Sequence, residues 1–208
     1  MPNWLERLLG ETQARLVTLL RRSRQSITNL AGGLGLTDNA VRMHIAALHR
    51  DGIVEQVGLQ RDTGGKPARL YGLTREGEEL FPKAYALVLA KLIDEIVRTQ
   101  GRDRAIELLR SVGAQAAAGA PRGTNARRRL EAAAEVFRTL GADADVEKTT
   151  EGWRLQGYGC PLSAVTAGHA EVCELGKALV EEVVGEQVKE CCQRGERPRC
   201  GFEIASAT

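Results

Sequence analysis

The apolar positions in the first half of the chain repeat with helical spacing. From Trp4 to about Arg22 they recur at intervals of three and four, which predicts an amphipathic helix with six leucines as candidate core: Leu5, Leu8, Leu9, Leu16, Leu19 and Leu20. A second apolar set begins after Ser26, a residue suited to cap a helix, and comprises Ile27, Leu30 and Ala31. Two helices of the first domain are therefore expected before residue 35.

A third helix is predicted directly after a glycine-rich turn. Gly35 permits the positive φ that ends one helix, and the Thr37 hydroxyl can accept from an N–H near Ala40 to begin the next. One face of this helix is apolar, with Val41, Ile45 and Leu48. The other face carries Asp38, Asn39, Arg42, Met43 and Ala46. This order predicts a helix-turn-helix whose open face enters a major groove of DNA.

A basic hairpin follows the helix-turn-helix. Strands are expected over 53–57 and 68–73, joined by a glycine-rich tip at 62–67. Between Arg15 and Arg75 there are ten Lys and Arg against four Asp and Glu, a balance of +6, whereas the whole chain is only +2. Such concentrated charge favours phosphate contact. We therefore predict a winged helix with these DNA-contacting candidates: Thr37, Asp38, Asn39, Arg42, Met43, Arg61, Lys66 and Arg69.

The middle of the chain is predicted to be helical. Thr74 can cap a short helix, and a longer one is expected over 82–100 with more apolar residues than a solvent-facing helix needs: Leu87, Val88, Leu89, Leu92, Ile93, Ile96 and Val97. Two interpretations are open, an intramolecular core and a dimer helix, and we favour the dimer helix. Residues 101–141 continue as helix with a break at 119–125. The run Arg127–Arg129 is interpreted as a solvated face.

The pattern changes to mixed helix and strand after residue 141. Strands are expected over 146–150 and 153–158, a helix over 164–184, and a closing hairpin over 187–192 and 199–204. The predicted fold class is α+β, in three parts. They are a winged helix-turn-helix domain (1–81), a helical linker and dimerisation region (82–141) and a small α+β sensor domain that contains the cysteines (142–208).

The composition predicts which side chains build the core and in which compartment the protein acts. The chain has 208 residues, of which 43% are hydrophobic and 4% aromatic, so aliphatic side chains must build the core. No apolar run reaches the ~18 residues that a membrane span requires, and no secretory signal is apparent. We therefore expect a cytoplasmic protein, without membrane contact, whose thiols are reduced.

All five cysteines lie after residue 159, namely Cys160, Cys173, Cys191, Cys192 and Cys200. Twelve residues separate the first two, and no C-x-x-C is present, so the spacing is not that of a common zinc site. Spacing alone leaves open a metal site and a metal-free role, since cysteine often acts as a small buried hydrophobe.

Two segments resemble a known family. The segment GGKPARLYGLTREGEELFP in the first half, and GCPLSAVTAGHAEVC with GEQVKECCQRGERPRCGFEI at the end, are similar to regulators grouped with the iron–sulfur-dependent repressor of the Suf operon (SufR). This branch lies near the ArsR and DeoR winged-helix families. The resemblance implies a winged-helix dimer whose C-terminal domain holds an iron–sulfur cluster on cysteines, with cluster state setting operator affinity.

The resemblance also implies ligands. The family's first two cysteines fall on Cys160 and Cys173 and its last on Cys200, while its remaining cysteine falls near Glu186. The fourth ligand is therefore open among Cys191, Cys192, His169 and Glu186. Adjacent strand residues point to opposite faces, so only one of Cys191 and Cys192 can face the site, and we choose Cys192. The expected metal set is Cys160, Cys173, Cys192 and Cys200, with zinc or no metal as alternatives to the cluster. The same region also resembles the vinyl-reductase-type ligand-sensing module, which implies a metal-free small-molecule sensor.

An enzyme is not expected. The only histidines are His44, His49 and His169, and neither a P-loop nor a G-x-G-x-x-G after a strand is present. The sequence thus predicts a homodimeric transcriptional regulator, expected to be a repressor, that binds a pseudo-palindromic double-stranded DNA operator.

Overall fold

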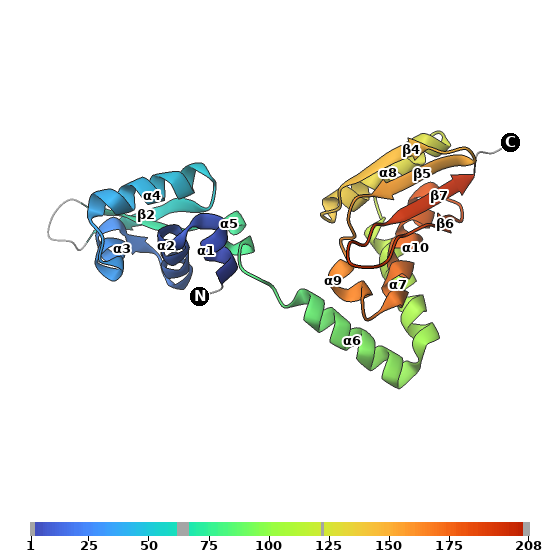
Figure 1. Cartoon of the computed structure of the whole chain (residues 1–208), viewed down its shortest axis with the longest axis horizontal. Helices are drawn as coiled ribbons and strands as arrows, with labels where there is room; N and C mark the ends of the chain where they lie inside the picture. Colours follow the sequence, from blue (N-terminus) through green and yellow to red (C-terminus); the bar gives the residue numbers. More distant parts are fainter. Residues whose placement is uncertain (1–2, 62–66, 122, 206–208) are drawn as a thin grey trace. The chain divides into compact units, whose positions relative to one another are not determined.

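The computed structural model describes residues 3–61, 67–121 and 123–205 and contains two compact units, residues 1–83 and residues 84–208 (Figure 1). Both units combine helices with an antiparallel sheet, so the α+β class is confirmed. No helix among the described residues is long and apolar enough to cross a bilayer.

The first unit is a helix-turn-helix followed by a β-hairpin. Its sheet has the order β1-β3-β2. The elements are α1 (Asn3–Leu9), α2 (Glu11–Arg22), β1 (Gln25–Ser26), α3 (Ile27–Leu34), α4 (Asp38–Arg50), β2 (Val54–Gln60), β3 (Ala68–Leu73) and α5 (Arg75–Glu79). Helices α3 and α4 are the predicted helix-turn-helix, and β2 with β3 forms the wing.

Side-chain caps set the start of α3 and of α4 as the sequence predicts. The Ser26 hydroxyl accepts from the Asn29 N–H at 3.3 Å, and the Thr37 hydroxyl accepts from the Ala40 N–H at 3.2 Å. Gly35 has φ 68° between the two helices, a conformation that favours glycine. Val41, Ile45 and Leu48 are buried as predicted, together with Ile27, Leu30 and Ala31 of α3.

Two predictions for this unit were wrong in detail. The expected helix over 4–22 is two helices, because Gly10 adopts φ 80° between α1 and α2. The break leaves Leu8 61% exposed, so it is not a core residue. The short strand β1 was not predicted, and it forms because Gln25 and Ser26 pair with Tyr71 and Leu70 of the wing.

Among its described residues, the second unit contains four helices of 12 to 16 residues, a four-stranded sheet and a segment of short helices. Its antiparallel sheet has the order β4-β5-β7-β6. The elements are α6 (Tyr85–Gln100), α7 (Arg102–Ala116), α8 (Ala126–Thr139), β4 (Ala144–Lys148), β5 (Gly152–Gly157), α9 (Ser163–Thr166), η1 (Ala170–Val172), α10 (Cys173–Val184), β6 (Lys189–Glu190) and β7 (Gly201–Ala205). The expected helix over 164–184 is interrupted between α9 and η1, and Cys173 begins α10 rather than lying in the middle of a helix.

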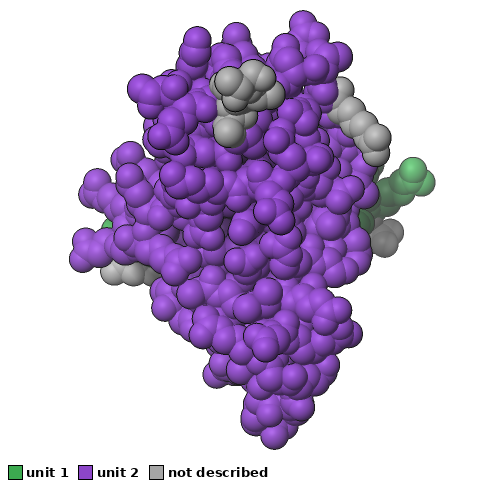
Figure 2. Space-filling model, turned by 90° about the vertical axis from the view of Figure 1, so that its right-hand side faces the viewer, with its two compact units in different colours: residues 1–83 green, residues 84–208 purple. Residues whose placement is uncertain are grey.

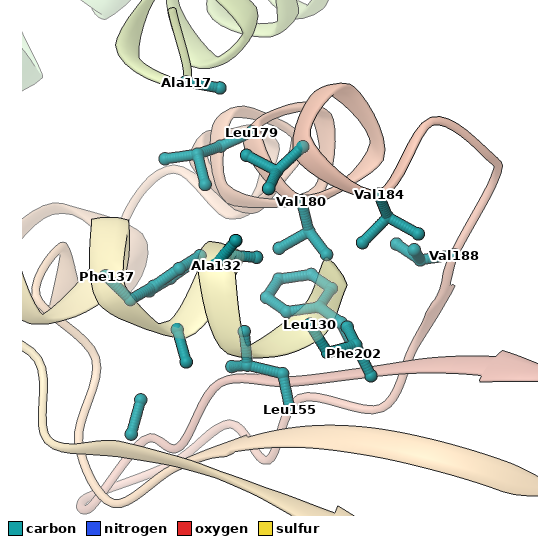
Figure 3. Packing of buried hydrophobic residues seen from close by; sticks show 14 of the residues in the cluster. Ala117, Leu130, Ala132, Phe137, Leu155, Leu179, Val180, Val184, Val188 and Phe202 are labelled. Carbon is teal, nitrogen blue, oxygen red and sulfur yellow. The ribbon is translucent and has the colours of Figure 1, made fainter. Parts of the chain in front are cut away.

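A single core joins α8 and α10 to the sheet. Figure 3 shows Phe137 and Leu130 of α8, Leu179 and Val184 of α10, and Phe202 of β7 meeting in this core. The Phe137 and Phe202 rings are tilted, with centroids 5.9 Å apart. Because burying a Leu, Val or Phe side chain is worth about 1.5–3 kcal/mol, this core holds the cysteine-bearing strand and helix in place.

The helical region and the cysteine-containing region pack as one unit rather than two (Figure 2). Helix α7 lies so close to α10 that a Cβ at Gly113 would stand 2.1 Å from the Leu175 carbonyl oxygen. Arg110 of α7 bridges Glu174 at 2.8 Å and Glu181 at 2.5 Å, both on α10. These contacts make residues 102–116 part of the same body as the sheet.

Candidate nucleic-acid interface and cysteine pocket

The face of α4 opposite the core is open to solvent. Met43 is 69% exposed, and the side chains of Asn39 and Arg42 also lie on this face. Asp38 has a structural role as well, because its carboxylate accepts from the Thr28 hydroxyl at 3.0 Å and so connects α3 to the start of α4. Arg42 lies 4.0 Å from the same carboxylate.

A hollow of about 560 Å³ lies between the start of α3, Arg42 of α4 and the first residues of β3 in the wing. Its wall includes Arg42 from α4, Arg69 from β3 and the hydroxyl side chains of Ser26, Thr28 and Tyr71. Arg61 is exposed just beyond the end of β2. Lys66, also predicted to contact DNA, lies outside the described residues.

Four of the five cysteines line one pocket of about 630 Å³ in the second unit. Cys160 follows β5, Cys173 begins α10, Cys192 follows β6, and Cys200 precedes β7. The four therefore come from separate segments that the sheet and α10 bring to one end of the unit. They are the four residues predicted as metal ligands, and that they bind metal stays a prediction.

The fifth cysteine, Cys191, does not line this pocket. The Gly201 N–H donates to the Cys192 sulfur at 3.3 Å, whereas the Cys191 backbone N–H donates to the Gly201 carbonyl at 2.8 Å. The charged groups that act most strongly on the Cys191 thiol are Glu203 and Arg154, which pair with each other and do not line the pocket. The strand pairing thus turns the two neighbouring sulfurs in different directions.

The Cys200 thiol is in hydrogen-bond contact with both Cys160 and Cys192. Chiefly through this contact, the pKa of Cys160 falls to about 6 and the pKa of Cys192 is also lowered. The pKa of Cys200 is raised by the same two contacts, and burial raises the pKa of Cys173. The pocket therefore favours thiolates at Cys160 and Cys192, the form that binds metals and attacks electrophiles.

The other two candidates for a fourth ligand face elsewhere. His169 points to Asp94 and Glu171, with its ring nitrogens 3.6 and 3.4 Å from their carboxylate oxygens. Glu186 pairs with Arg129 at 2.6 Å. Neither side chain lines the cysteine pocket, and of the four candidates Cys192 is the one that lines it.

Over the described ranges, no three Cys, His, Asp or Glu side chains are grouped closely enough to hold a single metal ion. An iron–sulfur cluster does not need its ligands around one ion, because its four cysteine thiolates are distributed over two or more iron atoms.

Several pocket residues were not predicted. Ser163 and Thr166 of α9 contribute hydroxyls, and the Thr166 hydroxyl helps to lower the pKa of Cys160. The turn from Gln193 to Arg199 also lines the pocket with Arg194, which pairs with Glu190 at 3.2 Å. Two signals for this turn were visible in the sequence, the basic composition of RGERPR and its place between Cys192 and Cys200.

Comparison with known proteins adds little. No family model matches the chain, and no curated protein matches it. Among solved structures, the chain is similar to Bacillus subtilis PadR in a crystal structure with operator DNA. The identity is 14% over 83% of this chain and 92% of that chain, with a TM-score of 0.30. A TM-score this low does not establish a common fold.

The contact with Cys200 has a measurable consequence for Cys160. In metal-free protein, the rate of Cys160 alkylation by iodoacetamide should rise with pH around a midpoint near 6. Replacing Cys200 by alanine removes the hydrogen bond, so the midpoint should move toward the value of about 8.5 for a free cysteine. The rate–pH profile is followed by peptide mass spectrometry. Cys191→Ala, which leaves the contact intact, is the control, and an unchanged midpoint in Cys200→Ala contradicts the prediction.

Proposed function

We propose that the chain is a DNA-binding transcriptional regulator, acting as a homodimeric repressor on a pseudo-palindromic operator. The observation that carries the proposal is the solvent-exposed face of α4 beside a hollow lined by Arg42 and Arg69. An α-helix fits a major groove, and an arginine can form two hydrogen bonds to a guanine edge. Asn39 and Thr37 lie near Arg42 at the start of the same helix, where side chains of a recognition helix reach bases.

The wing supplies the second part of this surface. Arg61 and Arg69 are exposed on or beside its strands. Cations in such positions neutralise phosphates and set affinity without reading sequence.

The two arginines should have different effects when they are removed. Arg42→Ala should cost about 1–3 kcal/mol of operator binding and reduce discrimination against mismatched operators, because a base contact is lost. Arg69→Ala should weaken binding to all sequences alike and flatten the dependence of affinity on salt. Fluorescence anisotropy over a salt series measures both effects. Arg104→Ala, at an exposed position on α7, is the control. Unchanged affinity and specificity in Arg42→Ala would remove α4 from the interface.

Exposed apolar residues of α6 support the proposal that the chain forms a dimer. Ile93 is buried in the unit's own core, but Tyr85, Val88 and Leu92 are 75%, 61% and 55% exposed. Their spacing of three and four places these three side chains on one stripe of the helix. An exposed apolar stripe of this kind is typical of an interaction surface, and a second copy of the same helix is its proposed occupant. The helix therefore serves an intramolecular core on one face and, in this proposal, a dimer on another.

A charge on the stripe should separate the protomers. Leu92→Lys should halve the mass measured by light scattering and weaken operator binding, because each protomer would then contact only one half-site. Leu87→Lys is the matched control, since Leu87 is equally exposed but lies off the stripe among Lys91, Asp94 and Arg98. A variant Leu92→Lys that keeps the dimer mass rules out this face.

The cysteine pocket is proposed to hold an iron–sulfur cluster. Four thiols from separate segments suit it, because such clusters are held by four cysteine thiolates that need not be close in sequence. Cys160 and Cys192 are the thiols whose pKa is lowered, so they are prepared to bind as thiolates. When bound, the cluster would supply a redox-sensitive centre whose state sets operator affinity.

Neighbouring cysteines provide a sharp test of this proposal. Cys192→Ser should lose most of the iron and sulfide found in anaerobically purified wild-type protein, whereas Cys191→Ser should retain them, because only Cys192 lines the pocket. Absorption spectra with iron, sulfide and zinc analysis give the measurement. Equal iron in the two variants contradicts the assignment. Zinc without sulfide in the wild type would indicate a structural site, and neither metal would favour a small-molecule sensor.

A further inference from the structure

The segment between Cys160 and Cys173 has two faces. On one face, Ser163, Thr166, Ala167 and Ala170 line the cysteine pocket. On the other face, Val165 and Val172 are buried against α6 and α7. Both ends of the segment carry a cysteine of the pocket, so its position depends on what those two sulfurs bind.

The apolar face of this segment covers α6. Val165 of α9 and Val172 of η1 form one small core with Ile93 of α6 and Leu109 of α7, and all four are nearly inaccessible to solvent. Ile93 is the fully buried residue of α6. The segment thus provides much of the surface that holds α6 to its unit. This core is separate from the larger one between α8, α10 and the sheet.

A polar contact lies beside this small core. The His169 ring stands between Asp94 of α6, 3.6 Å from Nε2, and Glu171, 3.4 Å from Nδ1. Glu171 is buried and is also bridged by Arg102 of α7 at 3.3 Å. Asp94 is held in addition by Lys91 at 3.0 Å. His169 is thus the residue that connects the segment to a charged side chain of α6.

We propose that the segment 160–173 couples the cysteine pocket to α6, and that His169 is the positioning residue that secures this coupling through Asp94. The inference rests on the proposed function, because it specifies how pocket state reaches DNA affinity. Helix α6 begins four residues after Phe81, the last core residue of the winged-helix unit. Any change in α6 therefore acts next to the point where the chain joins the two units.

The two cysteines can restrain the segment at both of its ends, because both line the pocket. With Cys160 and Cys173 bound in the pocket, the ends are fixed and the valines hold α6. With the pocket empty, the contact between the Cys160 and Cys200 thiols is the restraint that remains at the ends. When Cys160 is modified, that contact is lost as well, and only the small core and the His169 contact keep the segment in place. Packed cores of this kind switch between discrete arrangements rather than deforming continuously, which turns a small change at the sulfurs into a repositioned helix.

The coupling can be tested through DNA affinity. The variants are His169→Ala and Asp94→Asn, the second chosen because an exposed carboxylate is replaced without disturbing a core. Both should keep the wild-type iron content, while the ratio of operator Kd values between cluster-free and loaded protein falls about fivefold or more toward one. Glu131→Gln, in an exposed ion pair within α8, is the control. Wild-type ratios in both variants overturn the proposal.

A second test needs no cluster. In metal-free protein, the Cys160 thiolate displaces iodide from iodoacetamide, which places a carboxamidomethyl group in the pocket. Hydrogen exchange of the α6 amides should then become faster in the wild type. In His169→Ala the exchange should be fast already and change little on alkylation. Unaltered α6 exchange on alkylation of the wild type overturns the coupling. An absence of iron in the wild type would instead contradict the proposed cluster, and the hydrogen-exchange experiment would then decide on the coupling.

Discussion

The pairing of β7 with β5 is the constraint on which the cysteine pocket depends. Cys200 immediately precedes β7, and its carbonyl accepts from the Gly157 N–H at 2.8 Å at the end of β5. The approach at Gly157 is close, because a Cβ there would lie 3.1 Å from the Gly159 carbonyl oxygen and 3.3 Å from the Cys200 Cβ. The pairing brings Cys200 beside Cys160, and β6 on the other edge of β7 brings Cys192. A slip of one residue would turn the sulfurs to the opposite face.

Local signals explain why the winged helix could be predicted well. Ser26 and Thr37 each form the predicted cap, and Gly35 takes the predicted conformation, because all three depend on nearest neighbours along the chain. The break at Gly10 was missed because the leucine spacing on both sides continues in helical register. The pairing of Gln25 with Tyr71 was also missed, since a strand of two residues has no period that a sequence can show.

The second unit was harder to predict because its geometry is set by tertiary contacts. Residues 164–184 have helical apolar spacing throughout, yet the chain bends around Gly168 and places Val165 and Val172 against α6. His169 contacts Asp94 and Glu171 instead, so a histidine near a cysteine in sequence does not line the pocket. The choice between Cys191 and Cys192 followed from strand alternation, but only the register with Gly201 identifies which sulfur lines the pocket.

Helix α6 connects these observations. Its sequence contains more apolar residues than one face can bury, and the structure divides them between the small core at Ile93 and the exposed stripe of Tyr85, Val88 and Leu92. Moving a helix held by so small a core requires less free energy than moving one buried in the main core of its unit, because few apolar contacts must be exchanged. If the exposed stripe pairs with a second copy, a shift of α6 would change the spacing of two DNA-binding units at once. The weak attachment of α6 would then be a requirement of regulation rather than a defect of packing.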